Sequence, residues 1–285
     1  MRKYAVIFAL AMAGQFQAQI VNEPKNHSKT WSQPYEPFRI AGNLYYVGTQ
    51  DLASYLIVTK KGNILINTGL ADSLPMIKNN IRKLGFKYQD IKVLLLTQAH
   101  YDHLGAMAAI KKETGAKLYV DYADADVVKS GGKSDYEMGK YGVTFAPINP
   151  DYILKDKDFV TLGDTKLMML HHPGHTKGSC SFLFETKDNK RNYKVLIANM
   201  PTIIIDHKFS DVATYPNIEK DYEYTLNEMK KLDFDIWVAS HGSQFGLLEK
   251  RKPKDQYNPK IFMNKKKYMD ELDSLEKAFI EKKSE

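Results

Sequence analysis

A short run at residues 98–103 carries the side chains best suited to chemistry in this chain. It reads Gln-Ala-His-Tyr-Asp-His and directly follows an apolar stretch, residues 91–97, with the composition of a buried strand. Imidazole nitrogens and carboxylate oxygens are ordinary zinc ligands, and a strand end fixes the backbone from which several can point inward. The run therefore predicts a hydrolytic zinc site. One position is unusual, because Gln98 is a neutral and weak ligand where histidine is expected.

Two further segments place histidines after strand-like sequence. Residues 171–179 read His-His-Pro-Gly-His-Thr-Lys-Gly-Ser after the apolar residues 166–170, and His241 follows the apolar residues 236–239. Six of the eight histidines fall in these three segments. A single histidine is commonly a surface or core residue, but three such segments at strand ends indicate ligands that converge on a metal.

Together these motifs resemble the metallo-β-lactamase superfamily. The resemblance rests on the His-x-Asp-His core that begins at His100, the Pro-Gly-His-Thr-x-Gly-Ser segment that begins at Pro173, and the late Ser240-His241 pair. Glutamine at position 98 together with Met200 resembles the GOB-type branch of the subclass B3 enzymes. The resemblance covers nearly the whole chain after the leader. It implies an α/β protein, an αβ/βα sandwich with the metal site at one edge between the sheets.

Carried over position by position, the resemblance implies two zinc sites. The first would use Gln98, His100 and His175, and the second would use Asp102, His103 and His241. Three protein ligands per metal leave a position for water, whose pKa zinc lowers to about 7. The resulting hydroxide would attack the lactam carbonyl, with Asp102 as the catalytic residue that orients it. Because an amide is less basic than imidazole, we expect one or two Zn²⁺ per chain and a stronger second site. The alternative is that Gln98 turns away and hydrogen-bonds the backbone.

Three residues are candidates for substrate binding. By resemblance, Thr202 corresponds to a serine-bearing position of the subclass and would contact a substrate carboxylate, unless it is an ordinary loop residue. Met200 follows the strand-like residues 193–198 and either lines the pocket or packs in the core. Tyr136 closes the glycine-bearing segment 131–136, which looks like a mobile loop.

The predicted function is hydrolysis of penicillins, cephalosporins and carbapenems. A lactonase or thioesterase of the same fold is the alternative, since this scaffold serves several chemistries. In the glyoxalase-type and lactonase-type hydrolases a carboxylate bridges the metals near position 200, and residues 197–201 contain none. A non-catalytic binding protein on a decayed site is a third possibility. The intact His100, Asp102, His103, His175 and His241 argue against it.

The first residues have the order of a signal peptide. Arg2 and Lys3 precede an apolar stretch, residues 4–14, and Ala18 offers a small residue for cleavage. We predict a signal peptide at residues 1–18, a metallo-β-lactamase domain at residues 19–285, and a periplasmic location. A buried N-terminal helix is the alternative reading. Removing 18 of 285 residues leaves 267, enough for one large domain.

Composition bounds the expected partners. Arg2 and Lys3 account for two of the formal charges, so +7 falls to +5 after cleavage. The densest basic run, at residues 265–267, lies in a helical pattern rather than in a groove with aromatics, so no nucleic-acid partner is expected. No segment after the leader suits stable membrane insertion. With Cys180 as its single cysteine, the chain can form no internal disulfide. We expect a monomer that binds β-lactam antibiotics.

The elements that position these motifs follow from periodicity and turn residues. Residues 20–36 are predicted to be an extended arm. Strands are predicted at residues 44–47, 54–59, 63–67, 91–97, 117–120, 158–161, 165–170, 179–185 and 193–198. Helices are predicted at residues 74–84, 104–113, 123–129 and 219–232, and from 268 to near the C-terminus.

Overall fold

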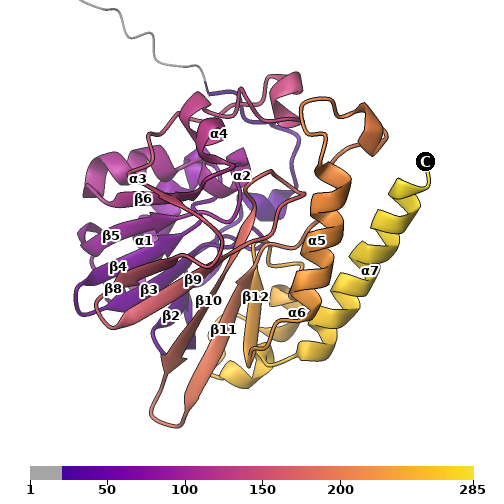
Figure 1. Ribbon diagram of the computed structural model, residues 1–285. Helices are drawn as coiled ribbons and strands as arrows, with labels where there is room; N and C mark the ends of the chain where they lie inside the picture. The colour runs from indigo at the N-terminus through magenta and orange to yellow at the C-terminus, as the bar shows by residue number, and fades with distance from the viewer. Residues whose placement is uncertain (1–20) are drawn as a thin grey trace, which may run out of the picture.

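The computed structural model describes residues 21–285, which form two β-sheets packed against each other with helices outside them (Figure 1). The strand order is β1-β2-β3-β4-β5-β6-β7 in one sheet and β12-β11-β10-β9-β8 in the other. This arrangement confirms the predicted α/β sandwich. The predicted signal peptide lies outside the described residues.

The seven-stranded sheet is antiparallel from β1 to β4 and parallel from β4 to β7. Its strands are β1 (Phe38–Ala41), β2 (Leu44–Tyr46), β3 (Tyr55–Thr59), β4 (Gly62–Ile66), β5 (Ile91–Leu95), β6 (Lys117–Asp121) and β7 (Tyr152–Leu154). The parallel connections contain α1 (Leu74–Lys83), α2 (Tyr101–Leu104), α3 (Met107–Thr114) and α4 (Ala125–Ser130). Parallel neighbours need such crossovers, which bring the strand ends that follow β5 and β6 to one edge.

The five-stranded sheet is antiparallel except for the β11–β12 pair. Its strands are β8 (Phe159–Leu162), β9 (Thr165–His171), β10 (Cys180–Lys187), β11 (Asn192–Ala198) and β12 (Ile236–Ala239). The crossover from β11 to β12 contains α5 (Ile218–Lys230), and α6 (Leu247–Lys250) follows β12. The last helix, α7 (Lys265–Lys283), lies beside α5 (Figure 1).

The alternation of side chains along the strands divides the core in two. Ile57 and Ile64 belong to the same apolar cluster as Phe182 of the second sheet, and all three are almost fully buried. Leu56 and Leu65 point to the other face and belong to the cluster that includes Ile77 of α1 and Ile110 of α3. Both faces of the central strands are therefore covered, which fixes the strand ends that carry the site.

Several predicted elements differ from the structure at their ends. The helix predicted at residues 104–113 begins only at Met107, as α3, and Leu104 ends the separate short helix α2; at Gly105, between them, a side chain would lie 2.5 Å from the carbonyl carbon of Leu70. The C-terminal helix begins three residues before the predicted start, because the Asn264 side chain accepts a hydrogen bond from the Lys267 N–H at 3.0 Å. The short strands β1 and β7 were not predicted.

The segment predicted as a mobile loop, residues 131–136, is instead closely packed. Asp135 and Tyr136 are both buried. The Gly132 N–H bonds to the Val127 carbonyl at 2.9 Å, and the Asp135 N–H bonds to the Gly132 carbonyl at 3.1 Å. The glycines supply left-handed backbone angles, with φ of +66° and +90°, rather than mobility.

The N-terminal arm is held to the domain by Glu23. Its carboxylate accepts hydrogen bonds from the Ala71 N–H at 3.0 and 3.2 Å. Burial raises the pKa of the Glu23 carboxyl from 4.5 to about 7. A raised acid pKa means that the folded state holds a proton that the unfolded state releases, so this group's contribution to stability falls as pH rises from 4.5 to 7.

We therefore expect Glu23→Gln to gain stability relative to the parent as pH rises from 5 to 8, because glutamine keeps an acceptor without the charge. Thermal unfolding across this pH range measures the difference in stability between Glu23→Gln and the parent. Glu36→Gln, at an exposed position of the same arm, is the control. A stability difference that stays constant from pH 5 to 8 would show that Glu23 does not titrate in this range.

Candidate metal centre

The predicted ligands come from the ends of three strands. Gln98 and His100 lie in the turn after β5, and α2 then presents Asp102 and His103. His175 lies between β9 and β10, and His241 follows β12. The turn after β5 is tied to the second sheet, since the Cys180 N–H bonds to the Thr97 carbonyl at 2.8 Å. The structure thus brings all three segments to one edge of the sandwich.

The second predicted ligand group is compact. The coordinating atoms of Asp102, His103 and His241 all lie within 4.8 Å of one another. Asp102 Oδ2 is 3.2 Å from His103 Nε2 and 3.6 Å from His241 Nε2. Burial opposes the charge on Asp102, but the two imidazoles lower the pKa of its carboxyl below the ordinary range. The group therefore contains an ionised carboxylate at neutral pH.

The first predicted group lies beside it. Gln98 is buried with its Nε2 atom 3.5 Å from His100 Nδ1, and the rings of His100 and His175 are 4.9 Å apart. Gln98 therefore faces the histidines, and a half-turn of its amide would present the oxygen, which is the coordinating atom. Burial, with His100 close by, lowers the pKa of His175 to about 3. Its ring is neutral at physiological pH, the form that coordinates metals.

One buried atom shows that a metal fits this arrangement. His103 Nε2 is fully buried and has no hydrogen-bond partner within the described residues, although it points toward Asp102 and His241. A buried polar nitrogen without a partner is costly, and a divalent cation among these three side chains would satisfy it. The donor set of imidazoles and one carboxylate suits zinc.

The outer ring nitrogens have partners that fix the rings. His175 Nδ1 is 2.7 Å from the Thr202 carbonyl oxygen, and His241 Nδ1 is 3.2 Å from Asp51 Oδ2. His103 Nδ1 is 3.4 Å from the Asn67 amide. The oxygen partners of His175 and His241 favour a proton on Nδ1, fix the direction of each ring and support its basicity, whereas the Asn67 amide nitrogen only limits the orientation of His103. The rings are therefore oriented before any metal binds.

Asp124 joins two of the ligand loops. Its carboxylate accepts hydrogen bonds from the Ala99 N–H at 2.8 Å, the Thr176 hydroxyl at 2.7 Å and the Gly178 N–H at 2.8 Å. A side chain at position 178 would lie 2.4 Å from the Asp124 nitrogen, so the close approach requires glycine. Asp124 thus joins the loop after β5 to the loop of His175, in addition to the hydrogen bond between the Cys180 N–H and the Thr97 carbonyl.

Comparison with known proteins identifies the family. The chain is 69% identical to the metallo-β-lactamase GOB-18 from Elizabethkingia meningoseptica, with a TM-score of 0.92 over 93% of this chain and 98% of that one. The chain belongs to the metallo-β-lactamase superfamily. The family model matches residues 51–188. A class B3 di-zinc metallo-β-lactamase, LRA-12 from an Alaskan soil metagenome, is 64% identical with a TM-score of 0.91, over 92% of this chain and 99% of that one. These similarities confirm the predicted subclass B3, GOB-type assignment.

Other curated relatives of this chain are more distant in sequence than these two enzymes. The hydroxyacylglutathione hydrolase of Pelagibacter ubique (strain HTCC1062) is 28% identical over 140 residues, which is 49% of each protein. An N-acyl homoserine lactonase from Bacillus cereus is 20% identical over 205 residues, covering 62% of this chain and 73% of the lactonase. The chain spans about half the length of the first curated relatives it matches.

Of the three residues predicted to bind substrate, Thr202 and Tyr136 contact the loop of His175. The Thr202 hydroxyl is 3.0 Å from His175 Nδ1. Tyr136 is buried, and its hydroxyl donates to the His175 carbonyl at 3.0 Å. Met200 is buried within the core cluster between the sheets. Thr202 and Tyr136 thus support the His175 loop, and the substrate contacts of all three stay predictions.

Two carboxylates that lie beside ligand histidines were not predicted from the sequence. Asp51 meets His241 and also accepts a hydrogen bond from the Trp31 indole at 3.0 Å, while the Trp31 and His241 ring centres are 5.5 Å apart. Asp135 lies 3.4 Å from His100 Nε2. Neither carboxylate follows a strand-like run next to a histidine, so no local signal marks them.

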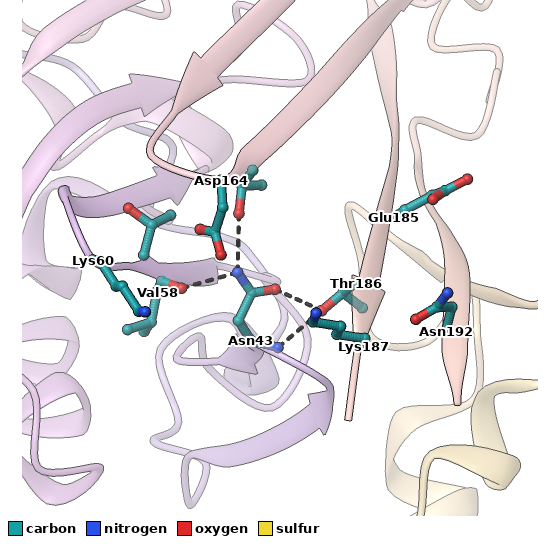
Figure 2. Close-up of a pocket in the computed structure, with 10 residues that line it drawn as sticks. Asn43, Val58, Lys60, Asp164, Glu185, Thr186, Lys187 and Asn192 are labelled. Carbon is teal, nitrogen blue, oxygen red and sulfur yellow. Dashed lines mark hydrogen bonds between the residues drawn. The ribbon is translucent and has the colours of Figure 1, made fainter. Parts of the chain in front are cut away.

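Two other features of the described residues include none of the predicted ligands. Glu137, Asp206 and His207 approach one another, but Glu137 is already paired with Lys140 at 3.0 Å. A cleft of about 620 Å³ is lined by Asn43, Lys60, Asp164 and Glu185, among other residues, and includes no predicted site residue (Figure 2). The Asn43 amide is fully engaged there, donating to the Val58 carbonyl and Thr165 and accepting from Thr186.

Proposed function

We propose that this chain is a zinc-dependent β-lactamase that hydrolyses the lactam amide of penicillins, cephalosporins and carbapenems. The observation that carries the proposal is the joint presence of both ligand groups at one edge of the sandwich, in a chain 69% identical to a metallo-β-lactamase over nearly its whole length. A similar enzyme at 64% identity is described as di-zinc, which supports two metal positions here.

Asp102, His103 and His241 would hold one zinc ion, and Gln98, His100 and His175 would hold the other. Bound zinc supplies a water with a pKa near 7 and polarises the carbonyl that is attacked. Asp102 is ionised, so its carboxylate can orient that water and hold its proton. The fixed rings of His175 and His241 keep the groups in place without rearrangement.

Within residues 21–285, the single cysteine is not suited to act as a nucleophile. Burial raises the pKa of the Cys180 thiol well above its usual value, and its Sγ donates to the Leu96 carbonyl. A buried, protonated thiol is inert. The proposed reaction therefore passes through no acyl-enzyme, and substituents that stall deacylation in serine enzymes give no protection.

The alternative is a lactonase or thioesterase. Curated relatives include an acyl-coenzyme A thioesterase from Gallus gallus at 28% identity and the lactonase from Bacillus cereus at 20% identity. The segment after β11 argues against this function, since it reads Asn199-Met200 and offers no carboxylate to bridge two metals. Both side chains are buried.

The test is turnover by the purified, zinc-loaded chain of a penicillin, a carbapenem, an acyl homoserine lactone and a thioester. We expect hydrolysis of the first two, inhibition by EDTA and no inhibition by clavulanate. Monobactams, which lack the second ring, should be spared. A protein that opens the lactone or the thioester but leaves both antibiotics intact would instead be the alternative hydrolase.

Gln98→His is expected to tighten zinc binding at the first site, because imidazole is the better donor. Zinc per chain after dialysis against a mild chelator measures the effect. Gln33→His, at an exposed glutamine of the N-terminal arm, is the control. Equal metal loss from Gln98→His and the parent would show that position 98 does not face a metal.

We further propose that the chain is exported to the periplasm and acts as a monomer. Export is supported by the order of charged, apolar and small residues at positions 2–18. None of the helices within residues 21–285 is long and apolar enough to cross a membrane. Osmotic-shock fractionation and the mass of the purified protein test the two statements separately.

A further inference from the structure

Asp135 is a buried carboxylate beside the first ligand group, in the turn between α4 and the 3₁₀ helix Met138–Tyr141. Its Oδ2 atom is 3.4 Å from His100 Nε2. Its Oδ1 atom accepts hydrogen bonds from the Glu137 N–H at 2.9 Å and the Met138 N–H at 2.6 Å. Because one oxygen is fixed by the backbone, the other is held against the outer edge of the imidazole.

The two nitrogens of His100 face different groups. Nδ1 is 3.5 Å from the Gln98 amide, within the first ligand group. Nε2 is buried and, in the part of the chain that the structure describes, makes no hydrogen bond of good geometry; the Asp135 carboxylate lies beside it. A carboxylate at this nitrogen favours the tautomer that carries its proton on Nε2, which leaves the Nδ1 lone pair free for a metal.

The two ligand groups differ in charge. The second contains the Asp102 carboxylate, and Asp51 lies behind its His241. The first consists of one amide and two imidazoles, and the outer nitrogen of His175 meets a carbonyl and a hydroxyl rather than a carboxylate. A carboxylate behind a ligand histidine raises the basicity of that ring. Asp135 is placed to do this for the group that lacks charge of its own.

We propose that Asp135 is a positioning residue that strengthens the first metal site by acting through His100, in compensation for the neutral Gln98. This inference rests on the proposed zinc centre. The local backbone supports it, since Gly132 has a φ of +90° and a side chain there would lie 3.1 Å from the Phe145 ring. The packed turn leaves Asp135 facing inward.

The test separates the two sites by removing one ligand from each. His241→Ala leaves the first group, and His175→Ala leaves the second. Asp135→Asn is then added to both, because asparagine keeps the size and an acceptor for the backbone N–H groups while it removes the charge. Zinc affinity is measured by competition with a chromophoric chelator. We expect a loss of roughly 10–100-fold in the His241→Ala background and less than about threefold in the His175→Ala background.

Two matched variants control the comparison. Asp51→Asn should have the opposite effect and weaken zinc binding in the His175→Ala background, since Asp51 contacts His241. Asp126→Asn, at an exposed position of α4, should leave zinc affinity unchanged in both backgrounds. Equal losses in both backgrounds would show a general folding role and overturn the inference, as would no loss in either. If the unsubstituted chain binds no zinc, the proposed function itself fails, and the inference fails with it.

Discussion

His103→Ala is expected to lose about one zinc per chain and to lower kcat/KM by at least ~10³-fold, equivalent to about 4 kcal/mol of transition-state stabilisation. His103 is fully buried, and its Nε2 atom faces Asp102 at 3.2 Å and has no hydrogen-bond partner among residues 21–285. Alanine would remove the central donor of the group that holds the only carboxylate among the predicted ligands. Metal analysis and steady-state hydrolysis of a penicillin measure both losses on the same sample.

His241→Ala should give the same paired loss, since His241 Nε2 is 3.6 Å from the same carboxylate. His171→Ala is the matched control. His171 is the last residue of β9, four positions before His175, but its ring pairs with Asp121 at 2.8 Å, and it belongs to neither ligand group. Near-full turnover by a His103→Ala protein shown to lack one zinc would mean that the first site carries the reaction.

The ligand positions could be predicted because each lies directly after a strand-like run. The residues that orient them could not. Asp51 and His241 are 190 positions apart, and Asp135 and His100 are 35 apart, so their contacts arise only when the loops fold over the sheet edge. An aspartate in a turn is common for local reasons, such as hydrogen bonding to its own backbone. Asp135 does this too, and its second role is not visible in the sequence.

The elements of the fold also divide into those that a local sequence pattern predicts and those that have no such pattern. The helix α7 could be predicted because apolar residues recur at helical spacing from Tyr268 to Ile280, and of these Tyr268, Leu272 and Phe279 are buried while Ile280 is exposed. The strand β7 has three residues, two of them exposed, so it has no apolar alternation to find. It forms because its backbone pairs with β6. The glycines of residues 131–136 suggest a mobile loop in the sequence, whereas in the structure they allow close packing.

Asp124→Ala is expected to be the most destabilising single change around the site, although Asp124 belongs to neither ligand group. It would leave the Ala99 N–H, the Thr176 hydroxyl and the Gly178 N–H without their acceptor in a buried environment. Each unsatisfied buried donor costs about 1–3 kcal/mol, so we expect a loss of about 4 kcal/mol and a fall in melting temperature of roughly 10 °C. Burial raises the pKa of the Asp124 carboxyl to about 6, so at pH 7.5 it is ionised and accepts all three bonds.

Zinc should be lost as well, because Ala99 lies between Gln98 and His100, and Thr176 follows His175. Without Asp124 the two loops lose the buried carboxylate that bonds to both of them, and we expect the geometry of the first site to loosen. Thermal unfolding of the metal-free protein separates the stability effect from metal binding, and zinc content at equilibrium measures the second effect. Asp126→Ala, two residues along and exposed, should shift the free energy of unfolding by no more than about 0.5 kcal/mol. A metal-free Asp124→Ala protein that melts within 2–3 °C of the parent would show that water replaces the lost acceptor and that the loops are held elsewhere.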